Sequence, residues 1–360
     1  MRVANKYILG VKPYVPGKPI EDVKRELGLK SVIKLASNEN PYPPSKKVLT
    51  ALNKAALTVN RYPDVGCFVL RKALAKHLKV KENQLIFGNG SDEVIVLAVK
   101  AFVAQGDEVI IAQPSFLIYD IAARLAGAKI KVVPLNNFRY DIERMKAAIT
   151  KRTKIIFIGN PDNPCGTFID CRQMEDLIKA ASKDTLIFID EAYFEYVQSK
   201  DYPDSIALIK KYPNVLVART FSKMYGLAGL RVGYGIGQGD VIDILTRLRE
   251  PFNVNSMAQS AAVAALGDQA YYKKIARDVE TQRQFLYRSL TGLKIKYEQS
   301  FTNFILVYAG GDSSAVAGAL LKNGVIVRDM KAWGLKGYIR VSIGTATENK
   351  RFIKTLVEAL

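Results

Sequence analysis

The sequence predicts an α/β protein in which helices cover a mostly parallel sheet, followed by a smaller α+β part. Between about residues 84 and 237, short apolar runs alternate with helical patterns, as expected of successive βαβ units. After Pro251 the pattern changes to long helices and then to a few more β-rich runs. A chain of 360 residues with 49% apolar residues can also bury a large core.

The strands of the main sheet are expected at six short runs rich in β-branched and aromatic residues. These runs are L-I-F-G (85–88), E-V-I-I-A (108–112), K-I-I-F-I (154–158), T-L-I-F-I-D (185–190), V-L-V-A-R (215–219) and R-V-G-Y-G-I (231–236). Helices are expected between them at 91–102 and 118–126, and beyond the boundary near Pro251 at 257–266 and 270–290. The smaller part is expected to contain strands N-F-I-L-V-Y (303–308), V-I-V-R (325–328) and Y-I-R-V-S-I (338–343).

Composition narrows the range of functions. No run of eighteen apolar residues and no signal-peptide pattern is present, so a cytoplasmic protein is expected. Three cysteines without metal-ligand spacing predict neither disulfides nor a metal site. The only histidine, His77, lies in a lysine-rich helical pattern, where a structural role is expected. The net charge of +19 can attract nucleic acid or small anions, but the basic residues are scattered and form no nucleic-acid motif.

A turn from a strand into a helix offers an anion site. G-N-G-S-D-E (88–93) follows L-I-F and opens the helix expected at 91–102, and free backbone N–H groups at such a helix start can bind phosphate. Glu93 occupies the place of the third glycine in G-x-G-x-x-G, which argues against a dinucleotide site. A simple capped turn, with Ser91 or Asp92 as N-cap, is the alternative.

Two further motifs stand at the carboxyl ends of predicted strands, where ligands bind in such sheets. N-P-D-N-P-C-G-T (160–167) forms a rigid turn from which Asn163 can present its amide; a plain tight loop is the alternative. Asp190 ends an apolar strand, where a carboxylate is costly unless it meets a positive partner, and Tyr193 follows it.

The stretch R-T-F-S-K-M-Y-G-L-A-G-L-R-V-G (219–233) adds Lys223 and Arg231. Pyridoxal phosphate requires a lysine amine that forms an imine, an acid beside its ring nitrogen, a tyrosine beside its ring oxygen and a Gly/Ser/Arg cup for its phosphate. Lys223, Asp190, Tyr193 and Arg231 meet these four requirements in one chain. The motifs therefore predict a pyridoxal 5'-phosphate enzyme.

With these motifs in this order, the chain resembles the fold type I pyridoxal-phosphate aminotransferases over essentially its whole length. Within them it is most similar to the histidinol-phosphate aminotransferase family. Besides the motifs above, this similarity lies in V-K-P-Y-V-P-G-K, K-L-A-S-N-E-N-P-Y-P-P-S, N-R-Y-P-D and V-I-V-R-D-M before Y-I-R-V-S-I-G-T. The resemblance implies a large cofactor-binding α/β domain at 46–250 and a smaller α+β domain at 251–360. It also implies a homodimer, with an arm at 1–45 that packs on the small domain and on the partner subunit.

The resemblance implies a role for each matched residue. Lys223 would hold the cofactor as a Schiff base and transfer the substrate proton, and Asp190 would pair with the ring nitrogen. Tyr193, which completes the catalytic set, would hold the 3′-oxygen together with Asn163. The other implied cofactor contacts are stacking by Phe116, phosphate binding by the backbone amides of Ser91 and Asp92 together with Ser222 and Arg231, and a phosphate contact from Tyr62 of the neighbouring subunit.

The activity implied by the resemblance is amino-group exchange between L-histidinol phosphate and 2-oxoglutarate, which yields imidazole-acetol phosphate and glutamate in histidine biosynthesis. Arg340 matches the arginine that clamps the substrate, and Arg328 and Tyr14 match the positions used with it for the substrate phosphate. A dianion favours more than one guanidinium. Asn163 would also contact the substrate, and Asn303 would line the site.

Three other functions remain open at this point. An aromatic-amino-acid aminotransferase of the same subgroup would share nearly every motif, and a decarboxylase of a phosphorylated amino acid could use the same scaffold. A non-enzymatic nucleic-acid-binding role, suggested by charge alone, is the most distant of the three.

Overall fold

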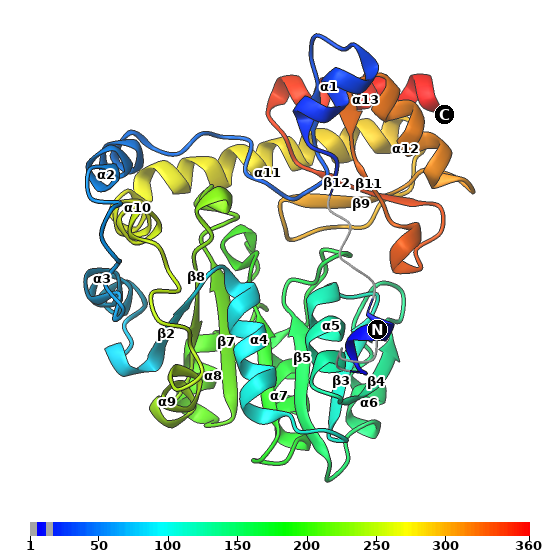
Figure 1. The fold of residues 1–360 in the computed structure, drawn as a ribbon. Coiled ribbons are helices and arrows are strands. Elements are labelled where there is room, and N and C mark those ends of the chain that lie inside the picture. The colour runs from blue at the N-terminus through cyan, green and yellow to red at the C-terminus, as the bar shows by residue number, and fades with distance from the viewer. Residues whose placement is uncertain (1–5, 12–16) are drawn as a thin grey trace.

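The computed structural model describes residues 6–11 and 17–360, and its central feature there is a seven-stranded sheet (Figure 1). The strand order is β2-β8-β7-β6-β5-β3-β4. β8 runs in the direction opposite to the other six strands, which are parallel to one another. The strands are β2 (Leu85–Gly88), β3 (Glu108–Gln113), β4 (Lys129–Pro134), β5 (Thr153–Gly159), β6 (Leu186–Asp190), β7 (Val215–Thr220) and β8 (Gly233–Ile236). The predicted mostly parallel sheet is confirmed.

Helices cover both faces of this sheet. They are α4 (Ser91–Phe102), α5 (Leu117–Leu125), α6 (Ile142–Ala147), α7 (Cys171–Ala180), α8 (Ser205–Lys211) and α9 (Gly239–Thr246). In β6, Ile187 and Ile189 join the core cluster that contains α7 and α8, whereas Leu186 and Phe188 join the cluster beneath α4 and α5. Because both faces are buried, the strands read as continuous apolar runs.

A second group of helices lies beside the β2 edge of the sheet. It consists of α2 (Lys46–Ala56), α3 (Phe68–Leu78) and α10 (Ser256–Leu266), with α10 packed against the other two. The long helix α11 (Gln269–Gly292) runs from this group across to the smaller layer (Figure 1). The helices expected at 257–266 and 270–290 are therefore confirmed.

The smaller layer is built around a three-stranded antiparallel sheet of order β11-β12-β9. Its elements are α1 (Ile20–Leu27), β1 (Ile33–Lys34), β9 (Phe304–Tyr308), α12 (Ser313–Lys322), β10 (Val325–Ile326), β11 (Arg328–Asp329), β12 (Tyr338–Ser342) and α13 (Ala346–Ala359). Short 3-10 turns complete the chain at Ile8–Gly10, Glu82–Gln84, Phe194–Tyr196, Ala228–Leu230 and Lys331–Trp333. The division of the chain at residues 45 and 250 stays a prediction.

The prediction of one strand at V-I-V-R was wrong, because the run is divided between two strands of different sheets. Val325 and Ile326 pair in parallel with β1, whereas Arg328 and Asp329 pair in antiparallel fashion with β12. The chain changes partner at Val327 because its two halves belong to different sheets. This change places Arg328 directly opposite Arg340 in the β11–β12 register.

In the part of the chain that the structure describes, no helix combines the length and apolar character needed to span a bilayer.

Candidate active site

The carboxyl ends of three neighbouring strands open into one cavity of about 340 Å³. The last residues of β5, β6 and β7, which are Gly159, Asp190 and Thr220, all line it. Ten of the residues singled out from the sequence share this lining, namely Ser91, Asp92, Phe116, Asn163, Asp190, Tyr193, Ser222, Lys223, Arg231 and Arg340. The volume and the position at the strand ends are typical of a small-molecule site in an α/β sheet.

Lys223 lies in this cavity just after β7. Its Nζ donates a hydrogen bond to the carbonyl of Ser37 at 3.4 Å and lies 5.7 Å from the centre of the Tyr193 ring. Burial and then the nearby Arg340 guanidinium lower the pKa of Lys223 to about 8. Because both effects disfavour the ammonium form, the amine is much easier to deprotonate near neutral pH than an ordinary lysine, as a nucleophile or base requires.

Asp190 presents a buried carboxyl group at the end of β6, where its residue is 6% exposed. One oxygen accepts a hydrogen bond from the Tyr119 hydroxyl at 2.7 Å, and the other accepts one from the Ala192 N–H at 3.1 Å. Burial raises the pKa of Asp190 to about 6. A cationic partner in the cavity would stabilise the carboxylate and offset this desolvation.

Tyr119, which holds the Asp190 carboxyl, was not predicted as a site residue from the sequence. Tyr119 is fully buried in α5, and its ring stacks on Phe157 with 4.6 Å between the ring centres. The sequence signal was a tyrosine three residues after Phe116 in the predicted helix, but its contact with Asp190 depends on how α5 packs over the sheet.

Tyr193 is joined to both sides of the cavity. Its hydroxyl accepts a hydrogen bond from the Asn38 amide at 2.9 Å, and the Asn163 amide nitrogen lies 3.5 Å away. The side-chain oxygen of Asn163 accepts a hydrogen bond from Arg340. Burial raises the pKa of Tyr193 to about 12, so the phenol stays protonated near neutral pH. Asn163 thus connects Tyr193 with Arg340.

Asn38 is a second residue of the cavity lining that was not predicted from the sequence. It has a φ of 54°, a left-handed conformation that asparagine tolerates better than most residues. Its backbone N–H also donates to the hydroxyl of Ser342 in β12. Asn303, which was expected to line the cavity, is instead fully buried behind it and donates to the Asn38 carbonyl. Asn303 therefore supports the segment that carries Asn38.

An anion cup forms where α4 begins, and we define it by Gly90, Ser91, Ser222 and Arg231. The Arg231 guanidinium donates to the Ser222 hydroxyl at 3.3 Å and to the Asp92 carboxylate at 3.1 Å. Gly90 has a φ of +81°, a left-handed conformation that favours glycine, and a Cβ atom there would lie 2.4 Å from Arg231 Nη2, so a larger residue would displace the end of this arginine side chain. The free N–H groups of the first turn of α4 complete an environment suited to a phosphate.

Gly233 supports this cup from behind, and its replacement by alanine is expected to destabilise the protein. A Cβ atom there would lie 2.4 Å from the Ser91 nitrogen and 2.6 Å from the Gly90 carbonyl carbon, both of which are backbone atoms. Gly233→Ala should therefore lower the free energy of unfolding by about 1–3 kcal/mol, measured by urea titration of the cofactor-free protein. Gly229→Ala is the matched control, because no heavy atom lies within 4 Å of its added Cβ. Equal stability of the two variants would contradict this packing argument.

Arg340 and Arg328 form a pair of like charges on the small sheet. They lie directly opposite each other across β11 and β12, so their side chains leave the same face of the sheet. Arg340 is 7% exposed, donates to the Ala36 carbonyl at 3.1 Å, and has its guanidinium 5.2 Å from the centre of the Phe304 ring. Like charges in direct register are destabilising by themselves, whereas a doubly charged anion between them would relieve the repulsion.

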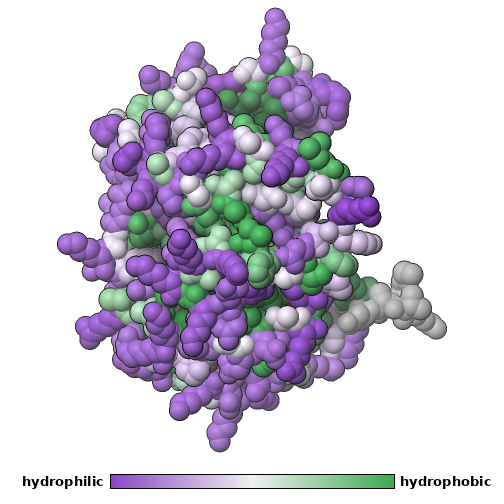
Figure 2. Space-filling model, turned by 90° about the vertical axis from the view of Figure 1, so that its left-hand side faces the viewer, coloured by the Kyte–Doolittle hydropathy of each residue, from purple (hydrophilic) through white to green (hydrophobic). Residues whose placement is uncertain are grey.

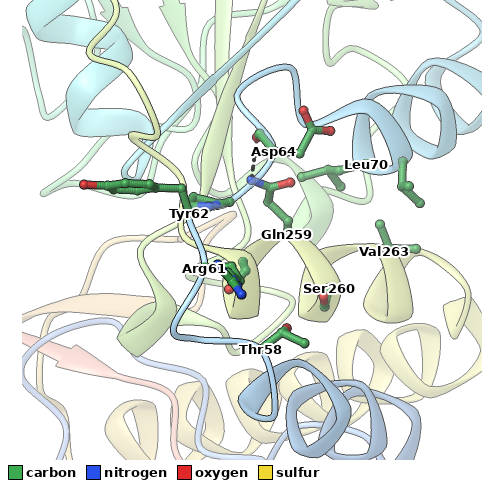
Figure 3. A pocket seen from close by; sticks show the side chains of 11 residues that line it. Thr58, Arg61, Tyr62, Asp64, Leu70, Gln259, Ser260 and Val263 are labelled. Atoms are coloured by element: carbon green, nitrogen blue, oxygen red, sulfur yellow. Dashed lines mark hydrogen bonds between the residues drawn. The ribbon is translucent and has the colours of Figure 1, made fainter.

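Tyr62 lies in a different place. The residue is 82% exposed, and its ring stacks on Phe252 with 4.5 Å between ring centres. Tyr62 is not among the described residues that line the Lys223 cavity. Figure 3 shows the ring directed outward from its turn, away from Leu70 and Val263. The contact of Tyr62 with a neighbouring subunit's cofactor stays a prediction. Tyr14 lies outside the described residues.

The surface around Tyr62 is unusually apolar. Figure 2 shows green side chains gathered in the middle of the face formed by α2, α3 and α10. The exposed apolar residues of this region are Leu49, Leu57, Val59, Tyr62, Val65, Phe68, Val69 and Phe252. Apolar patches of this kind mark protein interaction sites.

The chain is similar to known proteins over nearly its whole length. Residues 30–356 match the family model described as aminotransferase class I and II. A histidinol-phosphate aminotransferase from Moorella thermoacetica is 46% identical over 98% of this chain and 92% of its own length. One from Caldicellulosiruptor saccharolyticus is 42% identical over 97% of this chain and 98% of its own length.

Solved structures agree with these sequence relatives. The structure of histidinol-phosphate aminotransferase from Sinorhizobium meliloti in complex with pyridoxal-5'-phosphate has a TM-score of 0.91 at 28% identity, covering 100% of this chain and 98% of that one. Aspartate aminotransferase from Thermus thermophilus with maleate has a TM-score of 0.86 at 24% identity and full coverage of both chains. At that identity the second likeness concerns the fold alone.

Proposed function

Because the chain belongs to the class I and II aminotransferase family and has the fold type I architecture, we propose that it exchanges an amino group between L-histidinol phosphate and 2-oxoglutarate. The products would be imidazole-acetol phosphate and glutamate, a step of histidine biosynthesis. The names of relatives that are 46% and 42% identical over nearly the whole chain support this substrate. The observation that carries it is the register of Arg328 opposite Arg340: Arg340 lines the Lys223 cavity, and the Arg328 guanidinium lies against Trp333, which also lines it.

The cavity fits pyridoxal 5'-phosphate as the cofactor. Lys223, with its pKa lowered to about 8, would bind the cofactor through its amine. The anion cup would take the phosphate, because Gly90 leaves space against Arg231 and the first turn of α4 offers free N–H groups. When bound, pyridoxal phosphate supplies an electron sink for the charge that remains after the substrate loses a proton.

The other residues of the cavity would orient the cofactor and move protons. Asp190, held by Tyr119, would keep the ring nitrogen protonated, and this pairing would offset the cost of its buried carboxylate. Tyr193 and Asn163 would hydrogen-bond the 3′-oxygen, and Phe116 would cover the ring face. The neutral Lys223 amine would take the proton from the substrate carbon that bears the amino group.

Arg328 and Arg340 distinguish the proposed substrate from the main alternative. An aromatic amino acid presents one carboxylate, which a single buried arginine such as Arg340 can bind. Histidinol phosphate presents a phosphate dianion instead, and two arginines at directly opposite strand positions suit that charge better. This geometry favours histidinol phosphate over an aromatic amino acid.

We expect the active enzyme to be a homodimer. The apolar face around Tyr62 supports this proposal, because exposed residues of α2, α3 and the turn between them would be covered by a second copy. Tyr62 would then reach the cofactor phosphate of the neighbouring subunit. A cytoplasmic location stays a prediction from the sequence.

A substrate panel tests the proposed function. The kcat/KM of the enzyme loaded with pyridoxal phosphate should be at least about tenfold higher for histidinol phosphate than for phenylalanine or tyrosine, with 2-oxoglutarate as acceptor. Formation of glutamate in proportion to substrate consumed distinguishes transfer from decarboxylation. Equal or higher kcat/KM with the aromatic amino acids would instead identify an aromatic-amino-acid aminotransferase.

A further inference from the structure

Trp333 connects the paired arginines to the active-site cavity. It lies at the end of the 3-10 turn Lys331–Trp333, between β11 and β12, and its side chain lines the cavity that contains Lys223. The Arg328 guanidinium lies 4.6 Å from the centre of its ring, within the range of a cation–π interaction. One aromatic ring therefore contacts both the cavity and a cation beside it.

The position of Trp333 is fixed from both parts of the molecule. Its backbone N–H donates to the Met330 carbonyl at 2.9 Å, which holds the turn against β11. Its ring packs on a small cluster of Cys165, Leu306 and Met330, in which Leu306 belongs to the small sheet and Cys165 to the turn at 160–167 that carries Asn163. Trp333 thus spans the junction between the small sheet and the main sheet.

A second contact strengthens this junction. Phe138, from the connection after β4, packs on the same cluster and meets Tyr338 of β12 edge to face, with 5.3 Å between the ring centres. The Phe138 carbonyl accepts a hydrogen bond from Thr167 at 2.7 Å. The ring of Trp333 therefore rests on a surface connected to both the Asn163 turn and the small sheet.

We propose that Trp333 is a positioning residue for substrate specificity: its ring holds the Arg328 guanidinium beside Arg340 so that the two arginines together bind the phosphate arm of the substrate. This inference rests on the proposed function. Two like charges in direct register repel each other, and the Arg328 guanidinium lies over the Trp333 ring. The aromatic face gives Arg328 a favourable place near Arg340 before any anion arrives, which lowers the ordering cost of binding.

The kinetic test uses two variants of Trp333. With Trp333→Leu, which removes the π face but keeps an apolar side chain, the KM for histidinol phosphate should rise roughly 3- to 10-fold while kcat changes less than about twofold. Trp333→Phe should restore most of the affinity, because it keeps an aromatic face. The KM for phenylalanine, which has no phosphate, should change less than about twofold in both variants. An equal rise in KM for both substrates, or a Trp333→Phe variant that recovers no affinity for histidinol phosphate, would overturn the proposal.

Fluorescence provides a readout that does not depend on turnover. Trp333 is the only tryptophan in the chain, so the tryptophan emission of the holoenzyme reports on this ring alone. Inorganic phosphate should change that emission relative to sodium chloride of equal ionic strength, and Arg328→Ala should remove the change. The cofactor phosphate fills the anion cup in the holoenzyme, which leaves the paired arginines as the responding site.

The two measurements separate the inference from the proposed function. A wild-type enzyme that does not turn over histidinol phosphate would remove the proposed function, while a phosphate response lost in Arg328→Ala would still support the role of the ring and the arginine. Turnover of histidinol phosphate without any phosphate response at Trp333 would keep the proposed function and overturn the role of Trp333.

Discussion

Lys223→Ala is expected to abolish amino-group transfer. Lys223 is the one lysine among the described residues that line the cavity, so it alone can supply an amine as nucleophile and base. Burial together with Arg340 lowers the pKa of Lys223 to about 8. General-base catalysis alone contributes about 10²- to 10⁴-fold, and the covalent hold on the cofactor is lost as well. The kcat for histidinol phosphate should therefore fall at least about 10⁴-fold in steady-state assays with excess pyridoxal phosphate.

Two controls make this result specific. Lys223→Arg keeps the positive charge but cannot supply a neutral amine, because the guanidinium pKa is far above neutrality, so it should be as inactive as the alanine variant. Lys183→Ala removes an exposed lysine outside the cavity and should keep full activity. Bound-cofactor absorbance should differ from wild type in both Lys223 variants. Retention of more than about one hundredth of wild-type kcat in Lys223→Ala would rule out the role assigned to this amine.

The main sheet was predictable because its strands are buried on both faces. Runs such as T-L-I-F-I-D and V-L-V-A-R have polar residues only at their ends, and helices on both sides require this. β4 was missed because its sequence, K-I-K-V-V-P, alternates charged and apolar residues and lies at the sheet edge, where it is partly exposed. An edge strand has one neighbour and so imposes a weaker pattern on its sequence.

The division of V-I-V-R between two sheets could not be predicted from local sequence. All four residues favour strands, and no glycine or proline marks the change of partner at Val327. The pairing of Arg328 with Arg340 depends on this change, because a continuous strand paired with β1 would place Arg328 away from β12. The sequence identified both arginines but could not place them in register.

The site residues that could be predicted lie at or near strand ends. Asp190 ends a predicted strand, and Asn163 and Lys223 lie within five residues after one, so the rule that ligands bind at strand ends brings them together. Tyr119 and Asn38 reach the cavity through tertiary packing: one projects from a helix over the sheet, and the other comes from a segment held by the small sheet. No local pattern marks such residues, because their position depends on a distant part of the chain.

Arg328→Ala is expected to reduce activity selectively toward the phosphorylated substrate. Charge-assisted hydrogen bonds are worth about 1.5–3 kcal/mol, so kcat/KM for histidinol phosphate should fall roughly 10- to 150-fold. For phenylalanine and tyrosine, Arg340 can still bind the single carboxylate because it is buried and fixed by Asn163 and the Ala36 carbonyl. Their kcat/KM should change less than about threefold.

Arg340→Ala provides the necessary contrast. Because Arg340 lines the cavity, donates to Asn163 and lowers the pKa of Lys223, its loss should reduce kcat/KM for all three substrates. Arg288→Ala removes an exposed arginine of α11 outside the cavity and controls for the change in net charge. The ratio of kcat/KM between histidinol phosphate and phenylalanine is then the decisive quantity. If Arg328→Ala leaves this ratio unchanged, the paired guanidinium groups do not select the phosphate, and the substrate proposal loses its structural basis.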